Sequence, residues 1–304
     1  MEIRNVSIIG LGALGVMYAD FFTNRLGKEK VRVLADRDRI KRYSESRITC
    51  NGRECDFQYA DIADPMEPAD LLIFAVKYGG LQQAIRGAAP AVGENTLILS
   101  VLNGVSSEED LIEAFGEDKV VFCVAQKMDA LKDGSSVTYA HLGELAVGEL
   151  DGRRSERLRR LTDFFDQAEF PYELPDDMKK HEWGKLLCNT GLNQTLMVYE
   201  GTFELVQKEG EARELMKGAM REVVAVANSL GIELGEADID HWLEIINGLN
   251  PKGEPSMRQD ARARRKSEVE LFGGTICRLG RENNVPTPVN DFLYGRILEI
   301  EASY

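Results

Sequence analysis

The sequence predicts an α/β, doubly wound N-terminal domain followed by an all-α C-terminal domain. The chain has 304 residues, which is about twice the size of a typical domain. Short apolar runs alternate with helical stretches up to about residue 173, and after Pro171 and Pro175 the pattern is helical to the end. We therefore expect two domains, residues 1–174 and 175–304.

Five short apolar runs in the first half are predicted to be buried strands, at residues 6–9, 31–34, 71–76, 97–102 and 120–124. Their length and their content of branched residues favour strand over helix. Helical patterns lie between most of them, for example Gly15–Leu26 and Gly80–Ala89. This alternation is typical of a parallel sheet. Residues 137–139 and 145–147 are expected to pair as a later antiparallel hairpin.

The second half repeats apolar residues three and four positions apart, which is the spacing of an amphipathic helix. The predicted helical stretches span residues 176–189, 211–230, 238–248, 256–283 and 289–301. No internal repeat or low-complexity segment is visible. We therefore expect the second domain to be entirely helical.

A glycine-rich turn, Gly10-Leu11-Gly12-Ala13-Leu14-Gly15, follows the first predicted strand. In such a G-x-G-x-x-G pattern the first glycine permits a tight turn, the second lets the backbone approach a pyrophosphate, and the third lets helix and strand pack closely. The helix that begins here offers free N–H groups and a partial positive charge to phosphates. The turn therefore predicts a dinucleotide-binding, Rossmann-type domain with these six residues as cofactor contacts.

Further polar residues stand where predicted strands end. Asp36 lies 21 residues after Gly15, where an acid usually binds the ribose 2′-hydroxyl of NAD. Arg37 and the basic residues that follow could instead hold the 2′-phosphate of NADP, so the residues leave the cofactor open. Lys77 and Asn103 follow two later strands, at the carboxyl ends that face the ligand crevice. A solvated lysine and an Asn-Gly turn are the structural alternatives, and we favour the functional interpretation.

The most informative stretch of the second half runs from Trp183 to Asn193. Lys185, Asn189 and Asn193 are four and eight positions apart, so they share one side of a helix. Apolar residues flank them, and burying a lysine with two amides is costly unless it is paired or used. The alternative is structural, with Lys185 extending toward water and the amides capping a helix end near Gly191. The residues alone favour neither the functional nor the structural interpretation.

Ser256 opens a Ser-x-x-Gln pattern, a capping box that predicts the start of a helix. A purely structural cap is the commoner use of such a serine. The sharper hypothesis is that its hydroxyl and the helix N-terminus bind a substrate carboxylate. Glu268, twelve residues later, is either a surface acid or a partner of an active-site lysine.

Charge and hydropathy exclude two classes of protein. The chain carries 37 Lys+Arg against 51 Asp+Glu, a net charge of −14, and therefore repels nucleic acid. The one basic cluster, within residues 258–266, is expected to be an exposed helix surface. No apolar run is long enough to span a bilayer and no basic region precedes the first one, so we expect neither a membrane protein nor a secreted one.

Cysteine and histidine usage argues against a metal or a disulfide framework. The five cysteines are widely spaced without a C-x-x-C motif, and no two of the three histidines are placed as a metal pair. We therefore expect no metal site and a reducing, cytoplasmic location.

Taken together, these motifs resemble the ketopantoate reductase (2-dehydropantoate 2-reductase) family over nearly the full chain. The resemblance rests on the order and spacing of the Gly10–Gly15 turn, Lys77, Asn103-Gly104, Lys185 to Asn193, and Ser256 to Glu268. It implies that Lys185 is the catalytic acid and that the substrate ligands are Asn103, Asn189, Asn193 and Ser256. It also implies that Lys77, Asn103 and Glu268 contact the cofactor or order the site. Ala130, ahead of Leu131-Lys132-Asp133-Gly134, is a further candidate cofactor contact.

The implied function is the NAD(P)H-dependent reduction of 2-dehydropantoate, a small 2-oxo acid, to pantoate for pantothenate and coenzyme A. The resemblance favours NADP(H), with NAD(H) as the alternative, and a homodimer is compatible with the sequence. Two departures leave the substrate open: Gln194 stands where the family often has proline, and Asp36 is unusual for a strict NADP enzyme. The alternatives are an NAD-dependent D-2-hydroxyacid dehydrogenase of the same superfamily and a nucleotide-binding protein without catalysis.

Overall fold

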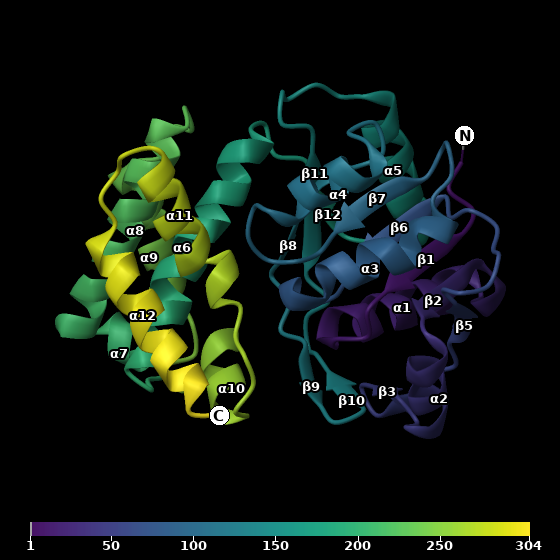
Figure 1. Cartoon of the computed structure of the whole chain (residues 1–304), viewed down its shortest axis with the longest axis horizontal. Coiled ribbons are helices and arrows are strands. Elements are labelled where there is room, and N and C mark those ends of the chain that lie inside the picture. Colours follow the sequence, from purple (N-terminus) through teal and green to yellow (C-terminus); the bar gives the residue numbers. More distant parts are fainter. Residues whose placement is uncertain (1) are drawn as a thin grey trace. The chain divides into compact units, whose positions relative to one another are not determined.

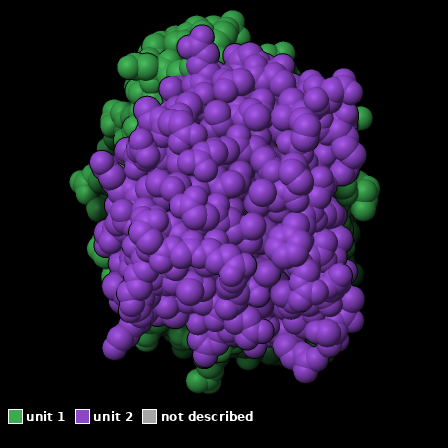
Figure 2. All heavy atoms as spheres, turned by 90° about the vertical axis from the view of Figure 1, so that its left-hand side faces the viewer, with its two compact units in different colours: residues 1–102, 106–178 green, residues 103–105, 179–304 purple. Residues whose placement is uncertain are grey.

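The computed structural model describes residues 2–304 and divides into two compact units (Figures 1 and 2). Unit 1 holds the chain up to residue 102 together with residues 106–178, and unit 2 holds residues 103–105 and 179–304. Unit 1 is α/β and unit 2 is helical, as the sequence predicts. The short segment 103–105 belongs with the helical unit although it follows a strand of the first.

A parallel five-stranded sheet forms the core of unit 1. Its strand order is β5-β2-β1-β6-β7, with bounds Gln58–Asp61, Val31–Ala35, Val6–Ile9, Leu71–Phe74 and Leu97–Ser100. The chain winds outward from β1 in both directions, so the carboxyl ends of all these strands lie at one edge of the sheet. The predicted parallel sheet is confirmed, and the glycine turn after β1 lies at that edge.

Helices bury both faces of this sheet. They are α1 (Ala13–Leu26), α2 (Arg37–Glu45), α3 (Leu81–Ala88), α4 (Ser107–Phe115) and α5 (Glu156–Ala168). On β6, Leu71 and Ile73 pack into one apolar cluster with side chains of α1 and α5. Leu72 and Phe74 pack into another with side chains of α3 and α4. Burial on both faces explains why β1, β6 and β7 are buried along their whole length and are largely apolar.

Two smaller sheets complete unit 1. One has the order β4-β3-β10-β9, with bounds Arg53–Glu54, Thr49–Cys50, Ser136–Thr138 and Leu131–Asp133. The other has the order β12-β11-β8, with bounds Tyr172–Glu173, Glu144–Gly148 and Phe122–Gln126. The fifth predicted strand, residues 120–124, is divided between two sheets. Its first residues make a parallel bridge from Val120 to Ile98 of β7, and the rest belongs to β8, which pairs antiparallel with β11.

The predicted hairpin between residues 137–139 and 145–147 is wrong. Val137 of β10 lies opposite Lys132 of β9, whereas β11 pairs with β8 and β12. The tight turn between β9 and β10 contains Gly134 at a φ of +56°, a conformation that glycine adopts without strain. This local turn gives β10 a partner closer in sequence than the one expected.

Unit 2 consists of helices. They are α6 (Met178–Val198, whose first residue belongs to unit 1), α7 (Glu204–Gln207), α8 (Glu211–Ser229), α9 (Glu236–Asn247), α10 (Ser256–Arg262), α11 (Gly273–Glu282) and α12 (Pro288–Ala302). The stretch predicted as helical over 256–283 is broken: α10 ends at Arg262, and Arg264 has a φ of +50°. Within residues 2–304, no helix has the length and apolar character needed to cross a membrane.

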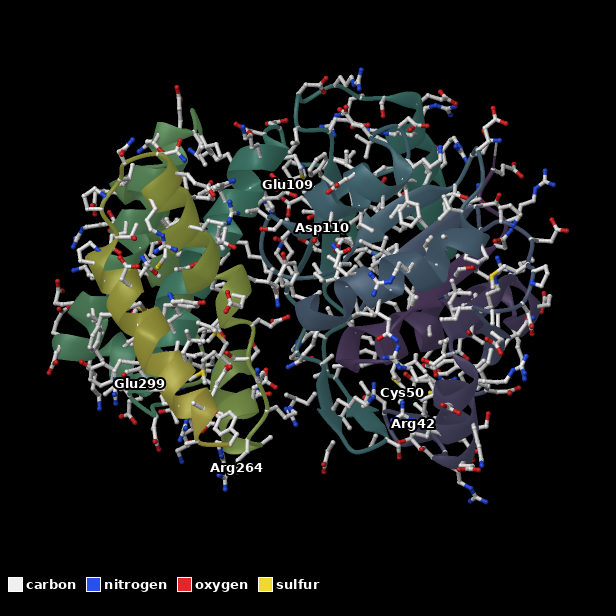
Figure 3. The ribbon with its side chains drawn as sticks, in the orientation of Figure 1. Arg42, Cys50, Glu109, Asp110, Arg264 and Glu299 are labelled. Atoms are coloured by element: carbon white, nitrogen blue, oxygen red, sulfur yellow. The ribbon has the colours of Figure 1, made fainter. Side chains whose placement is uncertain are left out.

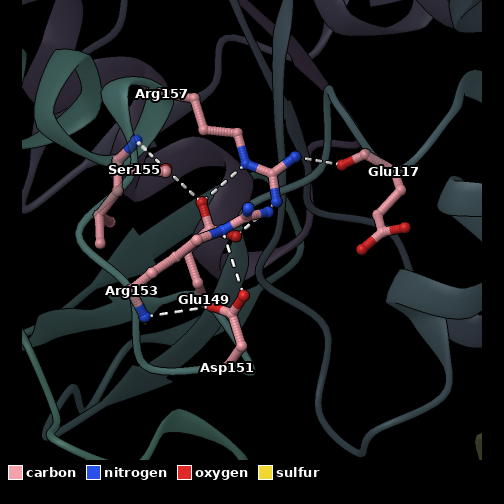
Figure 4. A network of polar contacts seen from close by, with 7 residues as sticks. Glu117, Glu149, Asp151, Arg153, Ser155 and Arg157 are labelled. Atoms are coloured by element: carbon pink, nitrogen blue, oxygen red, sulfur yellow. Dashed lines mark hydrogen bonds and ion pairs between the residues drawn. The ribbon is translucent and has the colours of Figure 1, made fainter.

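A buried ion pair ties β11 to α5 in unit 1 (Figure 4). Arg157 donates to both carboxylate oxygens of Glu149, once over 2.8 Å, and Ser155 at the N-cap of α5 donates to the same carboxylate. Burial by itself would raise the pKa of Glu149, but the hydrogen bonds from Arg157 and Ser155 outweigh it, so the pKa lies below its ordinary value. The side chains are only 3% and 13% exposed, so losing one partner would leave a buried charge.

We expect Arg157→Ala to destabilise the fold by about 3 kcal/mol at neutral pH, because it leaves Glu149 buried without its partner. Urea unfolding of wild type and variant measures the difference. Since the folded-state pKa of Glu149 is lowered, the contribution of the pair is fully present above the unfolded pKa of about 4.3. It is lost as the pH falls through the folded value, so the two proteins should converge in acid.

Arg153→Ala is the matched control. Arg153 lies four residues before Arg157 and pairs with Asp151 over 3.2 Å, but both side chains are more than half exposed. Exposed pairs contribute about 0–1 kcal/mol. An equal loss of stability in the two variants would contradict the special role of the buried pair.

Candidate functional site

The glycine turn has the geometry of an anion cradle. Gly10 has a φ of +102°, and a Cβ placed there would lie 2.6 Å from the carbonyl oxygen of Ala75. A Cβ on Gly15 would lie 1.9 Å from the carbonyl oxygen of Gly10. Gly12 is the N-cap of α1, which has no side-chain cap and no acidic residue in its first turn. The backbone N–H groups and the positive end of α1 are therefore suited to a dinucleotide pyrophosphate.

The end of β2 presents an acid beside arginines that are already paired. Asp36 is the N-cap of α2, and its Oδ1 accepts a hydrogen bond of 2.8 Å from the backbone N–H of Arg39. Arg39 also pairs with the Asp36 carboxylate over 3.5 Å. Arg37 donates to Asp61 over 2.8 Å and lies 3.6 Å from Asp64. The hydrogen bond to Asp61 raises the pKa of Arg37 above its ordinary value.

Lys77 stands at the same edge of the sheet as the glycine turn. It follows β6, the parallel neighbour of β1, and is the N-cap of the short helix Tyr78–Gly80. Its carbonyl accepts from the backbone N–H of Gly80 over 2.8 Å. The sequence-predicted cofactor residues of unit 1 are thus brought to the carboxyl ends of neighbouring strands, as the alternation of strands and helices leads one to expect.

Lys185, Asn103 and Glu268 form a hydrogen-bonded chain in unit 2. The Lys185 Nζ donates to the Asn103 Oδ1 over 2.9 Å. The Asn103 Nδ2 donates to the Glu268 Oε2 over 2.9 Å. The two bonds together fix the orientation of the Asn103 amide, with its oxygen toward the cation and its nitrogen toward the carboxylate. All three side chains are half-buried.

Asn189, Asn193 and Ser256 form a second cluster in the same unit. The Asn193 Oδ1 accepts from the Ser256 hydroxyl over 3.1 Å and from the backbone N–H of Met257 over 3.2 Å. The Asn193 Nδ2 lies 3.4 Å from the Asn189 Oδ1. The start of α10 at Ser256 is as predicted, but the predicted capping box is wrong. The Ser256 hydroxyl bonds to α6 rather than to its own helix, so Asn193 satisfies the start of α10 instead.

The helix α6 carries Lys185, Asn189 and Asn193 on one side because it continues past Gly191 to Val198. The structural alternative, a helix end near Gly191, is therefore wrong. A Cβ on Gly191 would lie 2.6 Å from the Met220 side chain. The glycine is thus needed for the close approach of α6 and α8, and not for a turn.

A buried polar network behind α6 was missed by the sequence analysis. The Gln194 Nε2 donates to the carbonyl of Thr190 and to the Asn290 Oδ1, each over 2.9 Å. The Asn290 Nδ2 donates to Glu222 over 2.8 Å. These contacts tie α6 to α12 and α8. Buried polar residues inside otherwise apolar helical stretches were the available signal.

Cys188 lies on α6 next to these residues but is not a candidate nucleophile. It is buried, and burial raises the pKa of its thiol to about 12, with Lys185 opposing the shift. A thiol in this state is neutral and unreactive at physiological pH. Among residues 2–304, no group of three or more His, Cys, Asp or Glu side chains could hold a metal ion.

The basic cluster is divided between a helix and the loop after it, which corrects the expectation of one helix surface. Arg258 and Arg262 lie on α10 and pair with Glu200 and Glu254 over 3.4 and 3.0 Å. Arg264, labelled in Figure 3, donates to the carbonyl of Ser303 over 2.8 Å. The acidic partners offset the charge of this cluster, so it offers no strong attraction for a phosphate backbone.

Comparisons with known proteins point to one family. The chain matches the family model described as "Ketopantoate reductase PanE/ApbA" over residues 6–152, and its C-terminal counterpart over residues 177–301. It is 26% identical over 297 residues to 2-dehydropantoate 2-reductase of Aquifex aeolicus (strain VF5), which covers 94% of this chain and 93% of that protein.

Two solved structures share the fold over nearly their whole length. Dimeric ketopantoate reductase from Staphylococcus aureus superimposes with a TM-score of 0.84 at 24% identity, covering 98% of this chain and 99% of that one. D-mandelate dehydrogenase with NADH and anilino(oxo)acetate superimposes with a TM-score of 0.88 at 20% identity, with the same coverage. At these identities the likeness concerns the fold alone.

We expect Gly12→Ala and Gly15→Ala to separate binding from folding. A Cβ on Gly12 would meet only the Ala75 carbonyl oxygen, at 3.6 Å, whereas one on Gly15 would lie 1.9 Å from the Gly10 carbonyl oxygen. Gly15→Ala should therefore lower the melting temperature or prevent folding. Gly12→Ala should keep the melting temperature but raise the Kd for NAD(P)H by about tenfold or more, because the second glycine of such a turn is the one that lets the backbone approach a pyrophosphate.

Thermal unfolding and fluorescence titration with NADH and NADPH measure the two effects. Wild-type affinity for both dinucleotides in Gly12→Ala would contradict the assignment of this turn to the cofactor.

Proposed function

Because the chain belongs to the ketopantoate reductase family, we propose that it reduces 2-dehydropantoate to pantoate with a reduced nicotinamide dinucleotide, for pantothenate and coenzyme A biosynthesis. The observation that carries the proposal is the chain from Lys185 through Asn103 to Glu268, beside the cluster of Asn189, Asn193 and Ser256. Together they offer an ammonium group, amides and a hydroxyl to a small polar acid.

Lys185 acts as the general acid in this proposal. Bound NADH or NADPH supplies the hydride that reduces the keto carbon. Negative charge then develops on the carbonyl oxygen, and the Lys185 ammonium stabilises that oxygen and donates a proton to it. Asn103 holds the ammonium in place by the 2.9 Å hydrogen bond to its Nζ, and Glu268 holds Asn103.

The other amides and the serine bind the substrate. The Asn193 oxygen already accepts two hydrogen bonds from the start of α10, so Asn193 mainly positions Ser256. The Asn189 Nδ2 then donates to the substrate's carboxylate, and the Ser256 oxygen, whose proton goes to Asn193, accepts from a substrate hydroxyl. Amides and hydroxyls bind such groups without adding a charge that would compete with Lys185 for the keto oxygen.

The cofactor proposal departs from the preference for NADP(H) that the resemblance implies. Arg37 is engaged by Asp61 and Asp64, and Arg39 by Asp36. These acids already pair with the two arginines, so a 2′-phosphate dianion would have to compete with carboxylates for both of them. We therefore propose that NADH is the preferred donor and that the Asp36 carboxylate accepts a hydrogen bond from the ribose 2′-hydroxyl.

The same observation supports a second candidate function. An NADH-dependent enzyme on this scaffold that reduces another 2-oxo acid to a D-2-hydroxy acid would use the same lysine chemistry. D-mandelate dehydrogenase, which shares the fold, has been solved with NADH. The two candidate enzymes would differ only in the protein groups that contact the variable part of the 2-oxo acid, beyond its keto and carboxylate groups.

Two further proposals concern the assembly and the compartment. We propose a homodimer, because the Staphylococcus aureus relative is dimeric. We propose the cytoplasm as the compartment, because all five cysteines are free thiols, which suits reducing surroundings.

We expect the purified protein to oxidise NADH faster than NADPH when it is offered 2-dehydropantoate. The measurement is the loss of reduced-nicotinamide absorbance, with both cofactors and a panel of 2-oxo acids.

Asp36→Ser should lower kcat/KM for NADH by about tenfold, since a hydrogen bond to a charged group is lost, while serine still caps α2. Asp38→Ser, an exposed acid in the first turn of the same helix, is the control.

The outcomes of this panel differ for each candidate. Preference for 2-dehydropantoate supports the first function, and preference for another 2-oxo acid with NADH supports the second. Preference for NADPH would overturn the role of Asp36, and cofactor binding without turnover of any acid would overturn both functions.

We expect Lys185→Ala to lower kcat by about 10²–10⁴-fold, the usual contribution of general acid catalysis, while the Kd for the cofactor stays unchanged. Ser256→Ala should instead mainly raise the substrate KM, since its hydroxyl binds ground state and transition state alike.

Lys180→Ala is the control for Lys185→Ala and should leave kcat close to that of wild type, because Lys180 lies on the same helix, α6, and pairs with Asp238 over 3.4 Å. Turnover near that of wild type in Lys185→Ala would remove Lys185 from its role.

A further inference from the structure

Lys132 reaches the glycine turn from a distant part of unit 1. It lies on β9, far along the chain from the turn, yet its Nζ donates a hydrogen bond to the carbonyl oxygen of Leu11. The strand is held by β10, which pairs antiparallel with β9 and parallel with β3. Val137 of β10 packs into the same apolar cluster as residues of α1. The position of Lys132 over the start of α1 is therefore built into the fold.

The charge of Lys132 has no counter-ion. Within residues 2–304, no carboxylate lies within ion-pair distance of its Nζ, whereas Lys127, a few residues earlier, pairs with Glu144. The residue as a whole is exposed, but its contact with Leu11 is part-buried, and this partial burial lowers the pKa of the ammonium. The ammonium beside Leu11 is therefore accessible to a ligand anion.

The glycine turn is the place where an anion is expected. Its backbone N–H groups and the N-terminus of α1 already favour a phosphate, and Leu11 lies between the two glycines that form the cradle. A single carbonyl oxygen uses only one of the three N–H donors of an ammonium group. Lys132 therefore has donors left for a phosphate oxygen beside Leu11.

We propose that Lys132 is a further cofactor-binding residue, which holds the glycine turn in its binding conformation and supplies a cation to the pyrophosphate of the bound dinucleotide. The identity of this ligand rests on the proposed function, but the contact with Leu11 does not. The resemblance to known reductases assigns no role to this lysine, which lies two residues after Ala130.

The test compares Lys132→Ala with Lys132→Arg and with Lys119→Ala. Lys119 also donates to a backbone carbonyl, that of Glu94, over 3.3 Å, but Glu94 precedes β7 and so lies at the opposite edge of the parallel sheet. We expect Lys132→Ala to raise the Kd for NADH and for ADP-ribose by about tenfold, the effect of losing one charge-assisted hydrogen bond. Lys132→Arg and Lys119→Ala should stay within about threefold of wild type.

Two further readouts distinguish binding from mere stability. The difference in Kd between wild type and Lys132→Ala should shrink as salt is added, because screening weakens the attraction of the ammonium for phosphate. In the protein without cofactor, hydrogen exchange at residues 11–13 should be faster in Lys132→Ala than in Lys119→Ala, since the contact with Leu11 is lost.

Unchanged affinity in Lys132→Ala, or an equal loss in Lys119→Ala, would overturn the proposal. If wild type bound neither NADH nor ADP-ribose, the proposed function would fail as well, and the exchange measurement would then show whether Lys132 still orders the turn.

Discussion

The unbroken course of α6 past Gly191 is the constraint on which the candidate catalytic residues depend. A helix rotates by about 100° per residue, so a break between Asn189 and Asn193 would turn one amide away from the other. The absence of a side chain at Gly191 lets α6 pack closely on α8, and the buried bonds of Gln194 hold the following turn to α12. The packing of α6 against α8 and α12 thus keeps the side chains of Lys185, Asn189 and Asn193 on one side of the helix.

Asn103 separates the two opposite charges of its cluster. The carboxylate orients the amide and the amide orients the ammonium, each through a hydrogen bond of 2.9 Å. Asn103 thus links the two charged side chains through a neutral group whose orientation both of them fix.

Much of the fold was predictable because its signals are local. Four of the five strands of the parallel sheet coincide with predicted apolar runs, whereas the polar edge strand β5 was not predicted. The glycine turn and the stripe from Lys185 to Asn193 each lie within a short stretch of sequence. Pairings between distant segments were not predictable. Nothing in the sequence indicates that β10 pairs with β9 and β3 rather than with β11, because short strands carry little information about their partners.

For the candidate site, too, local features were predictable from the sequence and contacts between distant residues were not. Residue types and spacing singled out Lys185, Asn103, Ser256 and Glu268, but not which of them touch. The Ser-x-x-Gln pattern around Ser256 suggested a local cap, and the serine instead bonds to Asn193 on another helix. A tertiary partner with a well-placed oxygen outcompeted the local one, and the contact of Lys132 with Leu11 likewise joins segments that no sequence window contains.

The grouping of residues 103–105 with the helical unit bears on how this protein could have exchanged parts during evolution. Recombination between relatives at a single junction near the end of unit 1 would transfer Lys185 and Glu268 together but leave Asn103 with the other parent. Such a hybrid would inherit the ammonium and the carboxylate from one lineage and the amide between them from another. The hydrogen-bonded chain within unit 2 therefore depends on two stretches of sequence, one on each side of such a junction.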